Sequence, residues 1–297
     1  MPDIAVWNIC NNKCIMCTND PSFARQDCGQ YRLKGQILKM EKYLKGKDNV
    51  YAKNAGDRSY LNLTGGEPTL HPDFFPLITY FRRRLPETFI SLLSNGRKFC
   101  DEEFTKKYLL AARPPFATVI PVHSSSPEEH DYIAGAAGSF EETVKGIENI
   151  LKYRKKGQYL DIRYIHHGIG KNRLSNTLSF MLERFPDTRQ YSFTVIHFEI
   201  EGHSFIDLDK IRLTLTESAA DVLKAKPLID RFRYFELYHY PLCVLDEGLR
   251  PLARITLPQE ERVYPENICG KCSQRKNCLG LMIDYYKIFG DKELHAL

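Results

Sequence analysis

The sequence predicts an α/β fold built on a parallel sheet, and two observations carry this prediction. Short apolar runs alternate with longer segments whose apolar residues recur at helical spacing. Glycines, serines, histidines and cysteines gather where the apolar runs end. Strands buried on both faces and separated by helices are typical of βαβ units. Parallel sheets of this kind bind ligands at the carboxyl ends of their strands, where these polar residues stand.

Six strands are expected, one for each apolar run. They cover residues 4–9, 60–63, 89–93, 117–122, 160–165 and 191–200. Helices are expected between them, over residues 37–44, 74–81, 104–112, 140–153 and 174–185. Helix-start residues support this assignment, because Pro72-Asp73 and Asp101 precede two of the helices and Ser139 with Glu142 has the pattern of a capping box.

The pattern changes after about Gly202. One more helix is expected over residues 215–229, followed by a strand-like stretch over 233–244 and a loop-rich tail that holds cysteines. We therefore divide the chain into a domain of residues 1–210 and a smaller module of residues 211–297. A chain of 297 residues is long enough for this arrangement.

The composition excludes several classes of function. The 42 basic and 37 acidic residues leave a net charge of +5 with both signs interspersed, so a clustered basic face for nucleic acid is not expected. The N-terminus lacks the pattern of a secretory signal, and no apolar run reaches the length of a membrane span. We expect a cytoplasmic protein that binds neither nucleic acid nor membrane. Its nine cysteines then stay reduced, so they need an explanation other than disulfides.

Cys10, Cys14 and Cys17 form a C-x3-C-x2-C pattern directly after the first expected strand. Closely spaced thiolates in a loop bind iron–sulfur clusters. Three ligands on a four-iron cluster leave one iron open for a substrate or cofactor. A zinc site and coincidental buried thiols are the alternatives, although zinc normally takes four ligands.

A glycine-rich segment, Thr64-Gly65-Gly66-Glu67-Pro68, ends the second expected strand. Two glycines allow the backbone to approach a ligand closely and to adopt a positive φ. Glu67 adds a carboxylate at the strand tip. The alternative is an ordinary turn from strand to helix, in which Pro68 stands near the helix start.

The two motifs together resemble those of the radical S-adenosylmethionine (radical SAM) superfamily. The segment from Trp7 to Cys17 is similar to the cluster loop of that family, and Gly65-Gly66-Glu67 is similar to its Gly-Gly-Glu motif. The resemblance implies a partial (β/α)6 TIM-like barrel, a 4Fe–4S cluster on the three cysteines, and SAM on the open iron. Gly65, Gly66 and Glu67 would position the methionyl amino group. Met16, where most members carry an aromatic residue, would lie near the adenine.

Two further strand ends fit the same resemblance. Ser94-Asn95-Gly96 follows the third strand and resembles a Thr-Asn-Gly segment that lies near SAM in the family. Ser124 follows the fourth strand, where members often place a polar residue on the ribose. Ser94, Asn95 and Ser124 are therefore expected at the cofactor, although Asn-Gly and serine clusters also mark ordinary turns.

The tail carries four more cysteines that can hold a second metal group. Cys269, Cys272 and Cys278 form a C-x2-C-x5-C pattern, and Cys243 lies upstream beside the strand-like stretch. Four cysteines suit tetrahedral zinc as well as a closed 4Fe–4S cluster.

This tail resembles the auxiliary-cluster modules of radical SAM enzymes, which are known as SPASM and, in the shorter form, twitch. Met282 stands where the full SPASM pattern has a further cysteine. The resemblance therefore implies one auxiliary 4Fe–4S cluster, closed by the four tail cysteines, in a twitch-like module. Cys28 and Cys100 receive no role.

By this resemblance, the reduced cluster cleaves SAM into methionine and a 5′-deoxyadenosyl radical, which abstracts a hydrogen atom from the substrate. A flavodoxin- or ferredoxin-type protein is the expected electron donor. No catalytic acid or base is assigned, although His166-His167 ends the fifth strand at the ligand face.

Three hypotheses for the function follow. The first is radical SAM chemistry on a peptide or protein side chain, and the second is the same chemistry on a small metabolite. The chain begins almost at the first strand, so no preceding peptide-recognition domain is expected, which weakens the first hypothesis. The third is a non-catalytic iron–sulfur or zinc protein for electron transfer or sensing, and it leaves Gly65-Gly66-Glu67 unexplained.

Overall fold

The computed structural model describes residues 3–45 and 59–297. Over this part of the chain, eight strands form one sheet in their sequence order, β1 to β8. The sheet confirms the predicted α/β class with a partial TIM-like barrel. It extends beyond the six expected strands, because β7 (Phe235–Tyr238) and β8 (Ala253–Arg254) continue it with parallel pairings.

The chain packs as two compact units that are interleaved along the sequence. The first consists of Met1–Lys13, Asn19–Pro121 and Ala134–Asp161, and the second of Cys14–Thr18, Val122–Ile133 and Ile162–Leu297. These units are defined by packing. A separate iron–sulfur module of residues 211–297 stays a prediction.

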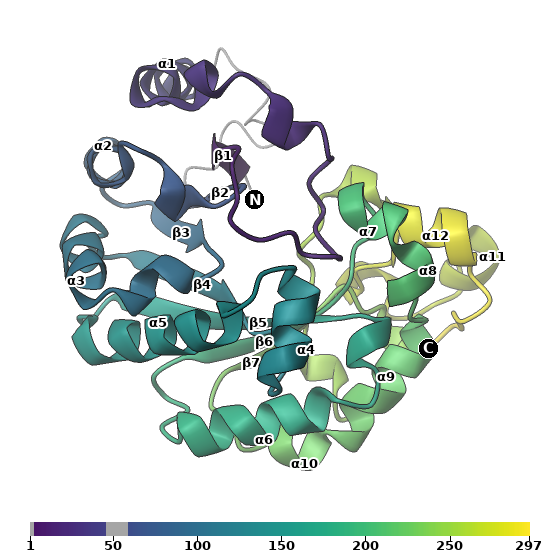
Figure 1. Ribbon diagram of the computed structural model, residues 1–297. Helices are drawn as coiled ribbons and strands as arrows, with labels where there is room; N and C mark the ends of the chain where they lie inside the picture. Colours follow the sequence, from purple (N-terminus) through teal and green to yellow (C-terminus); the bar gives the residue numbers. More distant parts are fainter. Residues whose placement is uncertain (1–2, 46–58) are drawn as a thin grey trace. The chain divides into compact units, whose positions relative to one another are not determined.

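The first unit contains the strands that end in the glycine-rich and Ser-Asn-Gly segments. Its strands and helices are β1 (Asp3–Trp7), β2 (Tyr60–Gly65), β3 (Phe89–Leu93), β4 (Phe116–Pro121), α1 (Leu33–Leu44), α2 (Phe74–Arg84), α3 (Glu102–Ala111) and α5 (Ser139–Tyr153). Parallel ladders join β1 to β2, β2 to β3 and β3 to β4. The four helices follow one another along the outer side of these strands (Figure 1). This order places the carboxyl ends of neighbouring strands at one edge of the unit.

The second unit contains the later strands and the cysteine-rich tail. Its elements are β6 (Ser192–His197), β7, β8, α6 (Leu174–Arg184), α7 (Gly202–Ile206), α8 (Leu208–Ile211), α9 (Leu215–Lys224), α10 (Lys226–Ile229), β9 (Arg262–Val263), α11 (Glu266–Cys269), β10 (Leu281–Met282) and α12 (Ile283–Phe289). Two further elements, β5 (Gln158–His166) and α4 (Pro127–Ala134), cross between the units. The tail is more regular than expected, because β9 and β10 pair in antiparallel fashion and α12 follows them.

Local chemistry explains where several helices begin and end. The side chain of Asp101 caps α3 by accepting the backbone N–H groups of Glu103 and Phe104, as predicted. The capping box predicted at Ser139 is wrong, because Gly138 is the N-cap of α5 and enters it with φ of 74°, a conformation that favours glycine. The helix expected over 215–229 breaks into α9 and α10 before Pro227, which lacks the N–H that a continuous helix requires.

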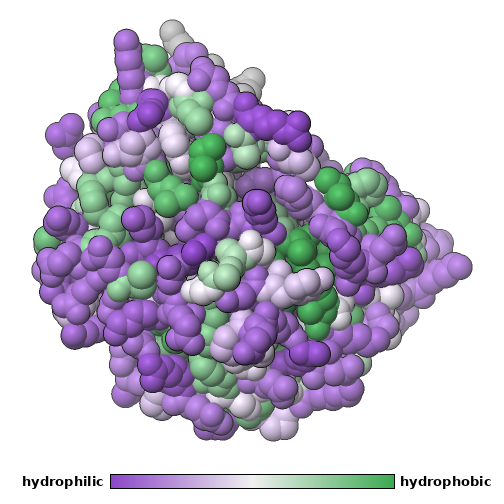
Figure 2. All heavy atoms as spheres, in the orientation of Figure 1, coloured by the Kyte–Doolittle hydropathy of each residue, from purple (hydrophilic) through white to green (hydrophobic). Residues whose placement is uncertain are grey.

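In the described ranges, no helix is both long enough and apolar enough to cross a bilayer. The face drawn in Figure 2 is mostly hydrophilic, with apolar residues in smaller groups between the polar ones.

Candidate active site

The glycine-rich strand end packs against the backbone that leads into the cysteine loop. Gly65 pairs with Trp7 in the β1–β2 ladder and has φ of 133°, and a Cβ there would lie 2.1 Å from the Trp7 carbonyl oxygen. A Cβ on Gly66 would lie 2.5 Å from the Ile9 carbonyl oxygen. The backbone N–H groups of Gly66 and Glu67 donate to the carbonyls of Trp7 and Ile9 at 2.7 and 2.8 Å. Both positions therefore require glycine for the end of β2 to pack against the backbone of Trp7 to Ile9, independently of any ligand.

Glu67 joins the end of β2 to the end of β3. Its carboxylate is buried and accepts four hydrogen bonds. Oε1 accepts from the Thr69 backbone N–H at 2.9 Å, the Thr69 hydroxyl at 2.5 Å and the Ser94 hydroxyl at 2.8 Å, while Oε2 accepts from the Asn95 N–H at 2.7 Å. Burial raises the pKa of Glu67, and these hydrogen bonds oppose the rise. The structure thus brings together Glu67, Ser94 and Asn95, three of the residues predicted at the cofactor.

The cysteine loop is tied to the end of β3 by two side chains. Asn95 donates through Nδ2 to Asn11 Oδ1 at 2.7 Å. Arg97 donates to the Asn11 carbonyl oxygen and to Asn12 Oδ1, each at 2.9 Å, and its other edge pairs with Glu142 of α5. Arg97 is one of 42 basic residues, and only its position directly after Asn-Gly distinguishes it in the sequence.

The three cysteines of the loop fall on both sides of the division between the units, which lies after Lys13. Cys10 is exposed in the first unit, and its sulfur accepts the backbone N–H of Asn12 at 3.3 Å. In the second unit, the Cys17 N–H donates to the Cys14 carbonyl at 3.2 Å, which closes a tight turn. The Cys17 carbonyl accepts the N–H of Ser204 at 3.1 Å, so α7 holds this part of the loop.

Met16 and Ser124 lie in the second unit and are both buried. The Ser124 hydroxyl accepts the N–H of Ser126 at 3.1 Å, in the turn that precedes α4. Their predicted contacts with the adenine and the ribose stay predictions.

The histidine pair at the end of β5 is buried. His166 Nδ1 lies 2.8 Å from the Ser218 hydroxyl, and its Nε2 lies 3.1 Å from Asp221 Oδ2. The Ser218 hydroxyl also lies 2.7 Å from the Tyr240 hydroxyl, so His166 belongs to an internal polar network. Burial lowers the pKa of His167 to about 3, which keeps its imidazole neutral near pH 7.

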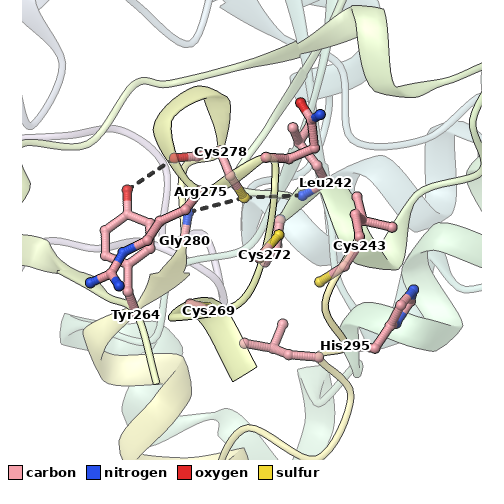
Figure 3. Close-up of a pocket in the computed structure, with 13 residues that line it drawn as sticks. Leu242, Cys243, Tyr264, Cys269, Cys272, Arg275, Cys278, Gly280 and His295 are labelled. Carbon is pink, nitrogen blue, oxygen red and sulfur yellow. Dashed lines mark hydrogen bonds between the residues drawn. The ribbon is translucent and has the colours of Figure 1, made fainter. Parts of the chain in front are cut away.

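The four tail cysteines line one pocket, to which the loop after β7 and the loop after β9 contribute (Figure 3). The Cys278 sulfur accepts two backbone N–H groups, from Leu242 at 3.3 Å and from Gly280 at 3.4 Å. Burial raises the pKa of the Cys243 and Cys269 thiols, and the charge of the neighbouring cysteines raises it further. The higher pKa favours the neutral thiols, and a bound metal would favour the thiolates instead.

Four cysteines around one pocket can hold either a 4Fe–4S cluster or a zinc ion. A structural zinc ion needs four ligands at about 2.0–2.3 Å from one point. Over residues 3–45 and 59–297, no three His, Cys, Asp or Glu side chains converge closely enough to hold a single metal ion. An auxiliary 4Fe–4S cluster on these cysteines stays a prediction, with zinc as its alternative. Met282 occupies the position at which the full SPASM pattern has a further cysteine. It is buried in β10 and packs as an apolar residue.

The parallel sheet, the three-cysteine loop and the glycine-rich strand end define a class of enzymes that bind SAM and an iron–sulfur cluster. The chain belongs to the radical SAM superfamily, whose family model matches residues 4–181. This membership confirms the predicted radical SAM enzyme with its 4Fe–4S cluster and SAM.

Sequence relatives come from mycobacteria. The mycofactocin maturase MftC of Mycobacterium tuberculosis (strain CDC 1551 / Oshkosh) is 26% identical over 152 residues, which cover 50% of this chain and 34% of MftC. MftC of Mycobacterium ulcerans (strain Agy99) is 28% identical over 112 residues, which cover 38% of this chain and 29% of that protein. The match thus spans about a third of the length of these relatives.

Solved structures share the fold. SuiB of Streptococcus suis, bound to its precursor peptide SuiA, superposes with a TM-score of 0.57 at 13% identity over 78% of this chain and 47% of SuiB. The enzyme anSMEcpe, with bound AdoMet and the Kp18Cys peptide, gives a TM-score of 0.55 at 15% identity over 79% of this chain and 62% of that one. At these identities the likeness concerns the fold, and it supports the partial TIM-like barrel.

Proposed function

We propose that this radical SAM enzyme modifies a side chain of a peptide or protein. The observation that carries the substrate class is the similarity to a family of maturases, the MftC proteins. Two structures of the same fold, SuiB and anSMEcpe, were solved with peptides bound, which supports the same class. A small metabolite is the alternative substrate.

Cys10, Cys14 and Cys17 are the proposed ligands of the catalytic 4Fe–4S cluster. When bound, the cluster and SAM supply the one-electron cleavage that yields a 5′-deoxyadenosyl radical. The chain's own contribution is to orient the ligands. The Asn12 N–H donates to the Cys10 sulfur, and Ser204 fixes the carbonyl of Cys17. Hydrogen bonds of this kind position cluster ligands and set their electronic properties.

The proposed SAM cradle comprises Met16, Gly65, Gly66, Glu67, Ser94, Asn95 and Ser124. Within it, Glu67 acts through its neighbours, because all the hydrogen bonds described above are made to groups of the protein. The Ser94 hydroxyl is engaged in the same way, since it donates to Glu67 and accepts the N–H of Gly96 at 3.1 Å. The Gly65 carbonyl accepts the Asn19 side chain at 2.8 Å. The part of the cradle at the ends of β2 and β3 is therefore held in shape by a buried carboxylate, without help from a cofactor.

Cys243, Cys269, Cys272 and Cys278 are the proposed ligands of an auxiliary 4Fe–4S cluster with no open iron. Their shared pocket and the two N–H groups on the Cys278 sulfur support this assignment. A flavodoxin- or ferredoxin-type protein is the proposed electron donor, because reductive cleavage of SAM consumes an electron from outside the chain.

The substrate class is tested with the low-molecular-mass fraction of cells that express the chain. The reconstituted protein is incubated anaerobically with SAM, reductant and this fraction, and 5′-deoxyadenosine is measured. Stimulation that disappears after the fraction is treated with a nonspecific protease supports a peptide. Stimulation that resists the protease contradicts the peptide proposal and indicates a metabolite.

A further inference from the structure

We propose that Arg97 raises the reduction potential of the catalytic cluster by acting through one peptide group of the cysteine loop. The proposal rests on the assignment of Cys10 as a cluster ligand. It concerns a positioning residue that neither the motifs nor the comparisons point to.

The geometry is a short chain of contacts within the first unit. Arg97 donates to the Asn11 carbonyl oxygen at 2.9 Å. The next backbone N–H, that of Asn12, belongs to the same peptide group and donates to the Cys10 sulfur at 3.3 Å. A cation therefore binds one end of the peptide dipole while the other end points at a cluster ligand.

The effect of this contact follows from peptide resonance. A cation on the carbonyl oxygen draws electron density from the peptide nitrogen, so its N–H becomes a stronger donor. Chains of hydrogen bonds polarise one another, with estimates of about 10–30% per bond. Hydrogen bonds to cluster sulfurs and nearby positive charge both favour the reduced, more negative cluster. Arg97 should therefore make the cluster easier to reduce.

Two features separate this effect from simple support of the loop. Asn95 ties Asn11 through the Asn11 side chain, so the loop keeps a tether when Arg97 is replaced. Glu142 pairs with the far edge of the guanidinium and makes no contact of its own with Asn11 or Asn12 among the hydrogen bonds described. Its carboxylate partly offsets the charge of Arg97, whose side chain is 15% exposed, and its removal should leave that charge stronger.

The test is a redox titration of the anaerobically reconstituted protein, followed by EPR. The signal that is followed is the one whose shape changes when SAM is added, because only a cluster with an open iron responds to SAM. At the potential where the wild type is half reduced, Arg97→Met should lower the ratio of reduced to oxidised cluster about tenfold, which for one electron corresponds to about 59 mV. The ratio for Arg97→Lys should lie between those of the wild type and Arg97→Met. Glu142→Gln should raise the ratio above that of the wild type.

Unchanged ratios in Arg97→Met and Glu142→Gln, at equal iron content, would overturn the proposal, as would shifts of the same sign. If Arg97→Met does not retain iron, Glu142→Gln decides alone, because it leaves the loop contacts in place: a raised ratio supports the proposal and an unchanged one overturns it. A wild-type protein without any SAM-responsive signal would instead refute the proposed cluster assignment.

Discussion

Replacing Glu67 by glutamine tests whether its buried carboxylate holds the ends of β2 and β3 together. The change keeps the shape of the side chain and exchanges one acceptor oxygen for an NH2 donor. All four of its hydrogen bonds come from donors, on Thr69, Ser94 and Asn95. In either orientation of the new amide, at least one donor therefore faces another donor.

The least costly orientation sets the expected magnitude. With the amide oxygen in the place of Oε1, three hydrogen bonds are kept and the Asn95 N–H loses its acceptor. An unpaired buried donor costs about 1–3 kcal/mol, and the three remaining hydrogen bonds lose the extra strength that a charged acceptor gives. Relief from burying a charge offsets part of this loss. We expect Glu67→Gln to lower the free energy of unfolding by about 2–4 kcal/mol.

Urea unfolding of the iron-free protein measures this cost without any cofactor. The fluorescence of the single tryptophan, Trp7, reports on this unit because Trp7 is buried at the end of β1. With an m-value of about 2–3 kcal/mol/M, the midpoint should fall by about 1 M. Glu247→Gln is the matched control, since Glu247 is exposed and such changes usually stay within about 0.5 kcal/mol. A Glu67→Gln midpoint equal to that of the control would refute the role given to the carboxylate.

Two further predictions use the same unfolding measurement. Gly65→Ala should lower the free energy of unfolding by about 2–4 kcal/mol, because the new Cβ meets a carbonyl oxygen at 2.1 Å and φ is positive. Gly138 also has a positive φ but open space around it, so Gly138→Ala should lower it by only about 1–2 kcal/mol. Equal losses in the two variants would contradict the steric argument. Burial lowers the pKa of His130 to about 4, so His130 is neutral when folded and gains a proton on unfolding once the pH falls below about 6.5. The neutral His130 contributes its full stabilisation above pH 6.5, and this stabilisation is lost as the pH falls toward 4. Between pH 7 and pH 5, the free energy of unfolding should therefore fall by about 2 kcal/mol less in His130→Asn than in the wild type. The same pH dependence in both proteins would contradict this prediction.

Most of the fold was predictable because its strands and helices are long enough to show a clear pattern of apolar residues in the sequence. Apolar runs and amphipathic segments identified the first six strands and the helices between them except α4, with limits that differ by a few residues from those observed. The later strands were harder to predict, since β8 has only two residues and takes its place from tertiary pairing. Glu142 illustrates the limit of local patterns, because the residue predicted as a capping partner instead pairs with Arg97, far away in the sequence.

The site was predictable at the level of motifs and less so at the level of roles. The segments that end β2 and β3 meet as expected, and Glu67 makes the connection. The glycines at 65 and 66 were explained by the approach of a ligand, whereas the structure shows that the neighbouring backbone already requires them. Arg97 belongs to no recognisable pattern, and only its contacts in the folded chain mark it.

The most direct test of the central claim compares the wild type with the triple variant Cys10→Ala, Cys14→Ala, Cys17→Ala after anaerobic reconstitution. Iron content and 5′-deoxyadenosine formed from SAM with dithionite are measured on both. We expect about eight irons per chain and SAM cleavage in the wild type, and about four irons without cleavage in the variant, since four irons remain on the tail cysteines. Undiminished 5′-deoxyadenosine formation by the variant would contradict the account.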